Sequence, residues 1–146
     1  MKQKNRQVEL SYYGLYLQQH LIENHPDKSS DNDFMAVRED LAADTFEQAR
    51  LVGYSVEGAQ ELAMKALLQG LHFSEFRTVT DILENEFGTN VPAEKVRGLA
   101  LVLLPRLKET FSGYPLSDDF ALSSEYDSLY SELTGTIAVY LDEHGI

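Results

Sequence analysis

The predicted fold depends on VPAEKVRGLALVLLPRLKETF, residues 91–111. Residues 99–104 are the longest unbroken apolar run in the chain, and a helix that is apolar on every side is a buried helix. The run is too short to cross a bilayer, which needs about 20 apolar residues. Proline lacks the N–H that would bond back to Leu101, so a helix over 92–104 should kink or restart at Pro105 before it ends at Gly113. We therefore predict a buried central helix, kinked at Pro105.

The other segments with apolar residues at helical spacing predict five more helices. Ser and Asp residues that can cap a first turn precede them, and Gly or Pro follows them. The expected helices cover residues 11–25, 31–53, 55–71, 74–88 and 124–145. In the second of these, one side should carry the apolar set Phe34, Val37, Leu41, Thr45, Ala49 and Val52. In the last, Ser124 should cap the first turn.

No segment alternates as a strand does, so the predicted fold class is all-α. We expect a single bundle of about six helices packed around the central helix. The second and third helices are joined by a short connection that contains Gly53, and they should form an antiparallel hairpin. The third helix carries small apolar residues that would let a neighbouring helix approach closely.

The length of 146 residues fits one domain, 1–146, in which residues 1–9 are expected to form a flexible basic arm. The absence of cysteine from the sequence excludes disulfides, thiolate metal sites and a cysteine nucleophile. The amino terminus has positive charge but no apolar run after it, which is not typical of a secretory signal. We expect a cytoplasmic protein without membrane association.

Acidic residues dominate the composition, with 24 Asp and Glu against 12 Lys and Arg and a formal charge of −12. From Glu109 onward the sequence contains Asp and Glu but no Lys or Arg. Such a surface repels phosphate, so direct binding to nucleic acid is not expected except through the short basic arm at the start of the chain.

The four histidines form no metal-binding pattern in the sequence. His20 and His25 are five residues apart, which turns them about 140° away from each other on a helix, so they should not share a metal. His72 lies at a joint between two helices and is expected to cap carbonyls there, and His144 suits the end of the last helix. The carboxylate pairs lack the calcium-loop pattern. We predict no metal and no cofactor.

Motifs of catalysis are missing from the sequence as well. It contains no phosphate-binding glycine loop and no serine nucleophile elbow. We therefore expect a protein that is not an enzyme.

The segment 112–124 mixes turn residues with four large apolar side chains, so it should lie across the bundle with these groups pressed inward. Tyrosine gives large contact area at low entropy cost and is enriched in interfaces. The candidate interaction surface combines tyrosines with the neighbouring acids: Tyr114, Asp118, Asp119 and Tyr126.

Three stretches resemble an uncharacterised family of small acidic proteins from Bacteroidetes, a domain of unknown function. They are LLQGLHFSEF (67–76), DILENEF (81–87) and YPLSDDFALSSEYDSLYSELTGTIAVYLDEHG (114–145). The resemblance covers nearly the whole chain and implies a multihelical protein that occurs alongside mobile elements. That family has no assigned activity, so no site residue can be transferred from it.

Two hypotheses about function follow from these observations. The leading one is a non-enzymatic protein–protein interaction module that contacts a partner protein, or a second copy as a homodimer, through residues 112–130. The alternative is an acidic decoy, a DNA mimic that occupies a nucleic-acid-binding protein. A decoy requires that the acids at 81, 84, 86, 109, 118, 119, 125, 127 and 132 align in one elongated stripe.

Overall fold

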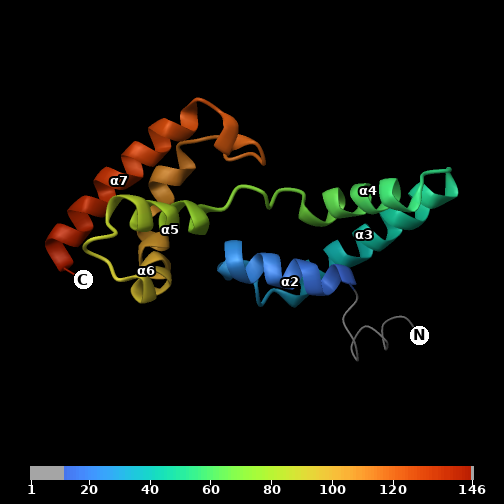
Figure 1. Cartoon of the computed structure of the whole chain (residues 1–146), viewed down its shortest axis with the longest axis horizontal. Helices are drawn as coiled ribbons and strands as arrows, with labels where there is room; N and C mark the ends of the chain where they lie inside the picture. Colours follow the sequence, from blue (N-terminus) through green and yellow to red (C-terminus); the bar gives the residue numbers. More distant parts are fainter. Residues whose placement is uncertain (1–11, 146) are drawn as a thin grey trace. The chain divides into compact units, whose positions relative to one another are not determined.

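The computed structural model describes residues 12–145, so the expected basic arm at residues 1–9 lies outside the described part of the chain. Within that part there are six α-helices, two short 3-10 helices and no strand, which confirms the all-α class (Figure 1). The helices are α2 (Tyr12–Asn24), α3 (Asn32–Leu51), α4 (Val56–Leu68), α5 (Glu75–Glu86), α6 (Ala93–Ser112) and α7 (Glu125–His144). The 3-10 helices are η1 (Pro26–Lys28) and η2 (Phe120–Leu122).

Three of the six described helices, α3, α4 and α5, begin at predicted caps. The side chains of Asp31, Ser55 and Ser74 each accept the N–H three residues further on, at 3.1, 3.0 and 2.8 Å. Each bond satisfies a donor that the first helical turn leaves without a partner. The predicted cap at Ser124 is wrong, because this residue has helical dihedral angles and its side chain makes no capping bond.

The chain divides at Leu71 and His72 into two compact units. Each unit has its own cluster of buried apolar side chains. The single domain expected over residues 1–146 therefore stays a prediction, and the two units are described separately.

The N-terminal unit consists of α2, α3 and α4, with η1 between α2 and α3. The hairpin predicted for the second and third helices is present as α3 and α4 (Figure 1). Gly53 in its turn has a φ of +107°, which a residue with a side chain rarely adopts. The two helices meet through small residues, and the buried positions include Ala42, Ala49, Ala59 and Ala63. Leucines of α2 and α4 complete this core: Leu17, Leu21, Leu67 and Leu68.

The apolar side predicted for α3 is only partly the buried one. Ala42 and Ala49 are buried, whereas Val37 and Val52 leave 66% and 74% of their surface in water. The close approach of α3 and α4 through alanines turns the larger side chains outward. The sequence pattern is compatible with either side, because α3 has apolar residues on both.

The C-terminal unit packs α5, α6 and α7 around one core, with Leu103, Leu107 and Leu133 almost fully buried. Each such side chain stabilises the fold by roughly 1.5–3 kcal/mol relative to an exposed one. Helix α6 contributes five buried residues: Val96, Ala100, Leu103, Leu107 and Phe111. It has the central position that the sequence predicts, within this unit.

The prediction that this helix is buried on every side is wrong, however. Leu101 and Val102 are 43% and 50% exposed, because only one face of the helix meets the core of its unit. The helix also continues through Pro105 as far as Ser112 and is capped at Gly113. Pro105 itself lies on the exposed face, where a missing N–H does not break contacts with the core.

Candidate interaction surfaces

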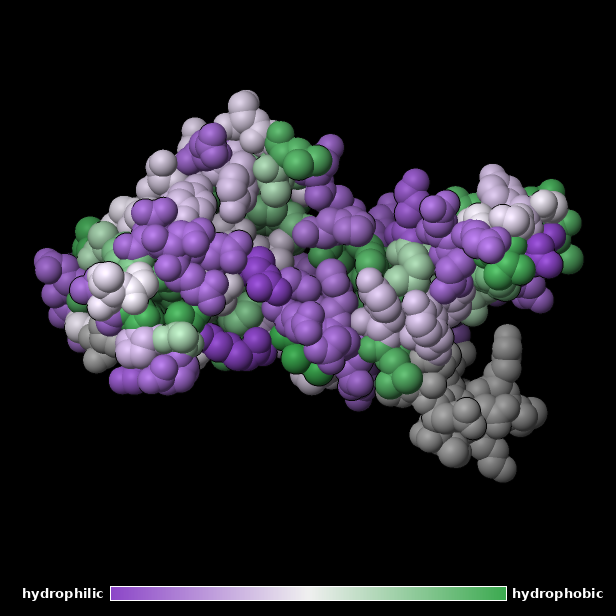
Figure 2. All heavy atoms as spheres, viewed as in Figure 1, coloured by the Kyte–Doolittle hydropathy of each residue, from purple (hydrophilic) through white to green (hydrophobic). Residues whose placement is uncertain are grey.

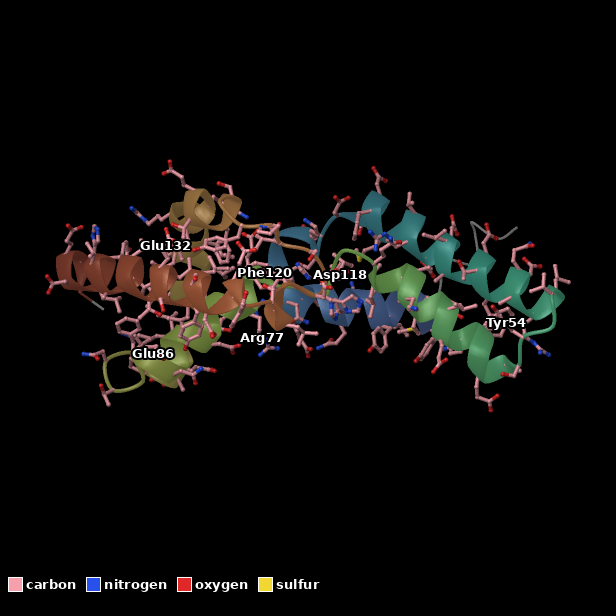
Figure 3. All side chains as sticks on the ribbon, turned by 90° about the horizontal axis from the view of Figure 1, so that it is seen from above. Tyr54, Arg77, Glu86, Asp118, Phe120 and Glu132 are labelled. Carbon is pink, nitrogen blue, oxygen red and sulfur yellow. The ribbon has the colours of Figure 1, made fainter. Side chains whose placement is uncertain are left out.

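The predicted surface at residues 112–130 contains an aromatic cluster, made by Phe73, Tyr114, Phe120, Tyr126 and Tyr130. Buried Phe120 of η2 lies at its centre, 5.4 Å from Phe73, 5.9 Å from Tyr114 and 6.3 Å from Tyr126 between ring centroids (Figure 3). All three ring pairs are edge-to-face, a favourable arrangement. Phe120 is therefore buried and Tyr114 and Leu116 are half-buried, as expected, but the expectation is wrong for Leu122, which stays exposed.

Carboxylates from the helices hold two tyrosine hydroxyls of this cluster. Tyr114 donates to Glu132 Oε1 at 2.6 Å, and Tyr130 donates to Glu86 Oε2 at 3.0 Å. The hydrogen bond to Glu132 raises the pKa of Tyr114 above its ordinary value. Burial is the main cause that raises the pKa of Tyr130, with Glu86 adding to it. These bonds favour the neutral phenols.

The two acids of the predicted surface, Asp118 and Asp119, accept hydrogen bonds from groups outside the aromatic cluster. Asp118 accepts the backbone N–H of His72 at 3.1 Å, and Asp119 accepts the hydroxyl of Ser117 at 2.7 Å. Both are exposed, while Tyr114 and Tyr126 are half-buried in the aromatic cluster. The structure thus joins the tyrosines through Phe120 and leaves the acids outside. Leu122 is the prominent apolar group here, 89% exposed.

A larger apolar area lies on the N-terminal unit. Sequence reasoning missed it because it assigned three of these residues, Val37, Leu41 and Val52, to the same side of the helix as Ala49, which is buried. We call it the hairpin surface. It consists of six exposed side chains on α3, the α3–α4 turn and the start of α4: Val37, Leu41, Leu51, Val52, Tyr54 and Val56. Figure 2 shows hydrophobic side chains gathered over the α3–α4 turn, and Tyr54 is labelled there in Figure 3.

An open groove of about 370 Å³ continues the hairpin surface between α3 and α4. Its lining includes Val52 and Tyr54 from the hairpin surface, Ala49 and Leu62 from the two facing helices, and Asp44 at one margin. The groove is almost entirely apolar, so it is suited to a large apolar side chain rather than to a polar substrate.

Acids follow one margin of the hairpin surface. Exposed carboxylates at Asp33, Asp40, Asp44 and Glu47 are spaced by seven, four and three residues, which puts them on one side of α3. We call this set the acidic row. Two ion pairs within residues 12–145 are Asp27 with Lys28 and Glu75 with Lys108, and neither of them involves Asp33, Asp44 or Glu47.

Two histidines converge in the N-terminal unit, contrary to the sequence prediction that they point apart. Their Nε2 atoms lie 3.1 Å (His20) and 2.8 Å (His25) from the carbonyl oxygen of Leu71, and the ring centroids are 5.7 Å apart. A carbonyl oxygen only accepts, so both Nε2 atoms carry hydrogen. Helix α2 ends at Asn24, and His25 leaves the helical path, which the 140° estimate did not include.

The described residues hold no cluster of three or more His, Cys, Asp or Glu side chains placed to bind a metal. Among the helices of residues 12–145, none combines the length and the apolar character that a membrane span requires. His72 has an exposed side chain and enters the joint through its backbone N–H instead.

Comparison with known proteins relates the chain to one family and to one solved structure. The family model described as "Domain of unknown function (DUF1896)" matches residues 5–146. The chain is similar to the crystal structure of protein PG0816 from Porphyromonas gingivalis, with 37% identity and a TM-score of 0.89 over 96% of this chain and 95% of that one. No curated protein matches the chain. The prediction of a family of unknown function is confirmed, and the similar structure comes from a Bacteroidetes organism.

Proposed function

Since the chain belongs to the DUF1896 family, a domain of unknown function, we propose from its surface that it is a non-enzymatic protein–protein interaction module. The observation that carries this proposal is the hairpin surface, with Leu51 and Val52 73% and 74% exposed. Its six side chains expose on the order of 600 Å², against roughly 800 Å² that each partner contributes to a standard interface.

The surface first predicted, Tyr114, Asp118, Asp119 and Tyr126, stays a second candidate of smaller apolar area. Its tyrosines are engaged in the aromatic cluster, which leaves Leu122 as the main apolar contact. A partner at this site would bind Leu122 and the rim of acids around it.

The acidic decoy has less support. Several of the carboxylates that it needs already accept hydrogen bonds from this chain: Glu86 from Tyr130, Asp118 from a backbone N–H and Glu132 from Tyr114. On α7, Glu125 and Asp127 are two residues apart and so lie on opposite sides of the helix. Both features work against one continuous stripe, and we favour the interaction module.

Affinity capture with three variants tests the proposal. We would immobilise the unmodified protein and three variants, Val52→Asp, Leu122→Asp and Val139→Asp, and expose each to a lysate of the source organism. Val139 is 57% exposed on α7 and serves as the matched control. We expect a partner that the full-length protein and Val139→Asp retain equally and that Val52→Asp loses by more than tenfold, because a charge would be buried in the contact.

The other outcomes are equally informative. If only Leu122→Asp loses the partner, the protein is still an interaction module, but its contact lies on the C-terminal unit. If every variant retains the same proteins as the full-length chain, the proposal is wrong. Circular dichroism of each variant confirms that it is folded before the comparison is made.

We further propose that the module acts in the cytoplasm and that genes for this family lie beside mobile elements. Fractionation of cells checks the first point. Inspection of neighbouring genes across many family members checks the second.

A further inference from the structure

We propose that the hairpin surface binds a basic amphipathic helix of a partner protein. This inference rests on the proposed function and names the chemistry of the partner. It is carried by three features of the N-terminal unit: the length of the apolar surface, the acidic row beside it and the groove at one end.

The apolar part of α3 has the length of a helical binding site. Val37 and Leu41 lie on the exposed side of α3, and exposed Val52 follows as its C-cap. At 1.5 Å per residue the distance along the axis from Val37 to Val52 is about 22 Å. A partner helix of about four turns would cover it. Helices that bind in this way place apolar residues at i, i+3, i+4 and i+7 against such a surface.

The acidic row decides the charge of the partner. Asp44 and Glu47 lie along one margin of the apolar side chains and make no ion pair with another residue of the described chain. The arginines of α3 are already engaged: Arg38 donates to the carbonyl of Leu67 at 2.9 Å and lies over the ring of Phe34, and Arg50 donates to the carbonyl of Tyr54 at 2.8 Å. A partner with lysines or arginines along the matching flank would supply the missing positive charge.

The groove supplies an anchor point. Val52, Tyr54 and Leu62 surround an apolar space next to the end of the apolar surface, with Asp44 at its margin. A leucine or phenylalanine near one end of the partner helix would fill it, and a lysine one turn away would reach Asp44. Anchors of this kind dominate binding energy in helical interfaces.

The same charges argue against a second copy of the chain as the occupant. Two α3 helices packed antiparallel about a two-fold axis would bring both acidic rows to the same side of the pair, where like charges repel. In a parallel pair, each row would face the flank that carries Arg38, which already has its partners. Neither arrangement neutralises the row.

Fluorescence anisotropy with designed peptides tests the inference. The probes are a basic helix of about 16 residues with apolar residues on one side and lysines on the adjacent flank, an acidic peptide of the same pattern, and a scrambled basic peptide. The proteins are the full-length chain, Val52→Asp, Asp44→Lys with Glu47→Lys, and the control Asp142→Lys with Glu143→Lys. The control makes the same change of charge on the exposed end of α7.

We expect the basic helix to bind the full-length chain and the α7 control at least tenfold more tightly than the scrambled peptide. Val52→Asp and the double variant Asp44→Lys, Glu47→Lys should both lose this preference. The double variant, which we call the doubly reversed variant, should gain affinity for the acidic peptide because its two acidic charges have become basic. Binding should weaken at least several-fold between about 0.05 and 0.5 M salt.

Equal binding of the basic and scrambled peptides would overturn the inference. So would a concentration-dependent increase of mass that Val52→Asp abolishes, because the occupant would then be a second copy. A captured partner that is lost with Val52→Asp but retained by the doubly reversed variant would preserve the interaction module and overturn only the basic chemistry of the partner.

Discussion

Tyrosine hydroxyls give the C-terminal unit its most specific contacts at the level of single residues. Phe120 holds the rings together, while carboxylates on two different helices accept from Tyr114 and Tyr130. Figure 3 labels the two acceptors, Glu86 of α5 and Glu132 of α7. The bond of Tyr114 ties the segment before α7 to α7 itself, and the bond of Tyr130 ties α7 to α5.

The raised pKa values of two tyrosines predict that the folded protein loses stability in alkali. Burial, with the charge of Asp81 next, raises the pKa of Tyr126, and burial with Glu86 raises that of Tyr130. A raised folded-state pKa contributes stability below the unfolded value of about 10, and this stability disappears as pH rises through the folded value. The double variant Tyr126→Phe, Tyr130→Phe should lose less stability between about pH 9 and pH 12 than the full-length protein does.

Urea denaturation across this pH range measures the effect, with each protein normalised to its own stability at neutral pH. Tyrosinate absorbance of the folded full-length chain locates the ionisation. Identical pH profiles for the two proteins would show that these phenols do not control the loss.

At the level of the helix, α6 illustrates how a continuous apolar run divides into two faces. Leu103 is fully buried, and Leu101, two residues before it, is 43% exposed. Two residues on a helix are about 200° apart, so both cannot face the same core.

This pair gives a matched prediction. Leu103→Ala should lower the free energy of unfolding by about 2–5 kcal/mol, because it leaves a cavity in the core. Leu101→Ala should cost less than about 1 kcal/mol, since much of its side chain is already in water. Chemical denaturation of both variants measures the difference, and equal costs would mean that α6 is buried on both faces.

The end of α2 should respond to acid. Burial lowers the pKa of His25, with the bond to Leu71 opposing it and the charges of His20 and Lys28 adding to it. A lowered folded-state pKa contributes stability above the ordinary value of about 6.5, and this stability is lost as pH falls through the folded value. His25→Gln, which keeps a donor, should therefore lose less stability between about pH 6.5 and pH 5 than the full-length protein.

Chemical denaturation at several pH values, together with the imidazole resonances of His25 in NMR spectra, checks this expectation. The comparison with the variant removes the contribution of carboxylates that titrate in the same range. A steeper acid loss in His25→Gln would contradict the assignment of a lowered pKa.

At the level of the whole molecule, the two units have separate cores, so damage to one core should stay within its unit. Leu67→Ala should raise amide hydrogen exchange in residues 12–71, and Leu103→Ala should raise it in residues 72–145. Mass spectrometry of peptic fragments measures both. A uniform loss of protection in either variant would instead favour the single domain that the chain length predicts.

The sequence by itself determined the helices and most of their boundaries. Asp31, Ser55 and Ser74 cap helices through bonds to the third residue onward, and Gly53 and Gly113 follow the ends of α3 and α6. Such signals depend only on near neighbours in the chain, so they can be read without the fold.

Only the tertiary structure decided which faces are buried and which distant groups meet. α3 is apolar on two sides, and its packing through Ala42 and Ala49 leaves Val37 and Val52 exposed as part of the hairpin surface. The meeting of His20, His25 and Leu71 depends on contacts between residues about fifty positions apart. The number and direction of neighbours around a helix set these outcomes, and no local pattern in the sequence contains that information.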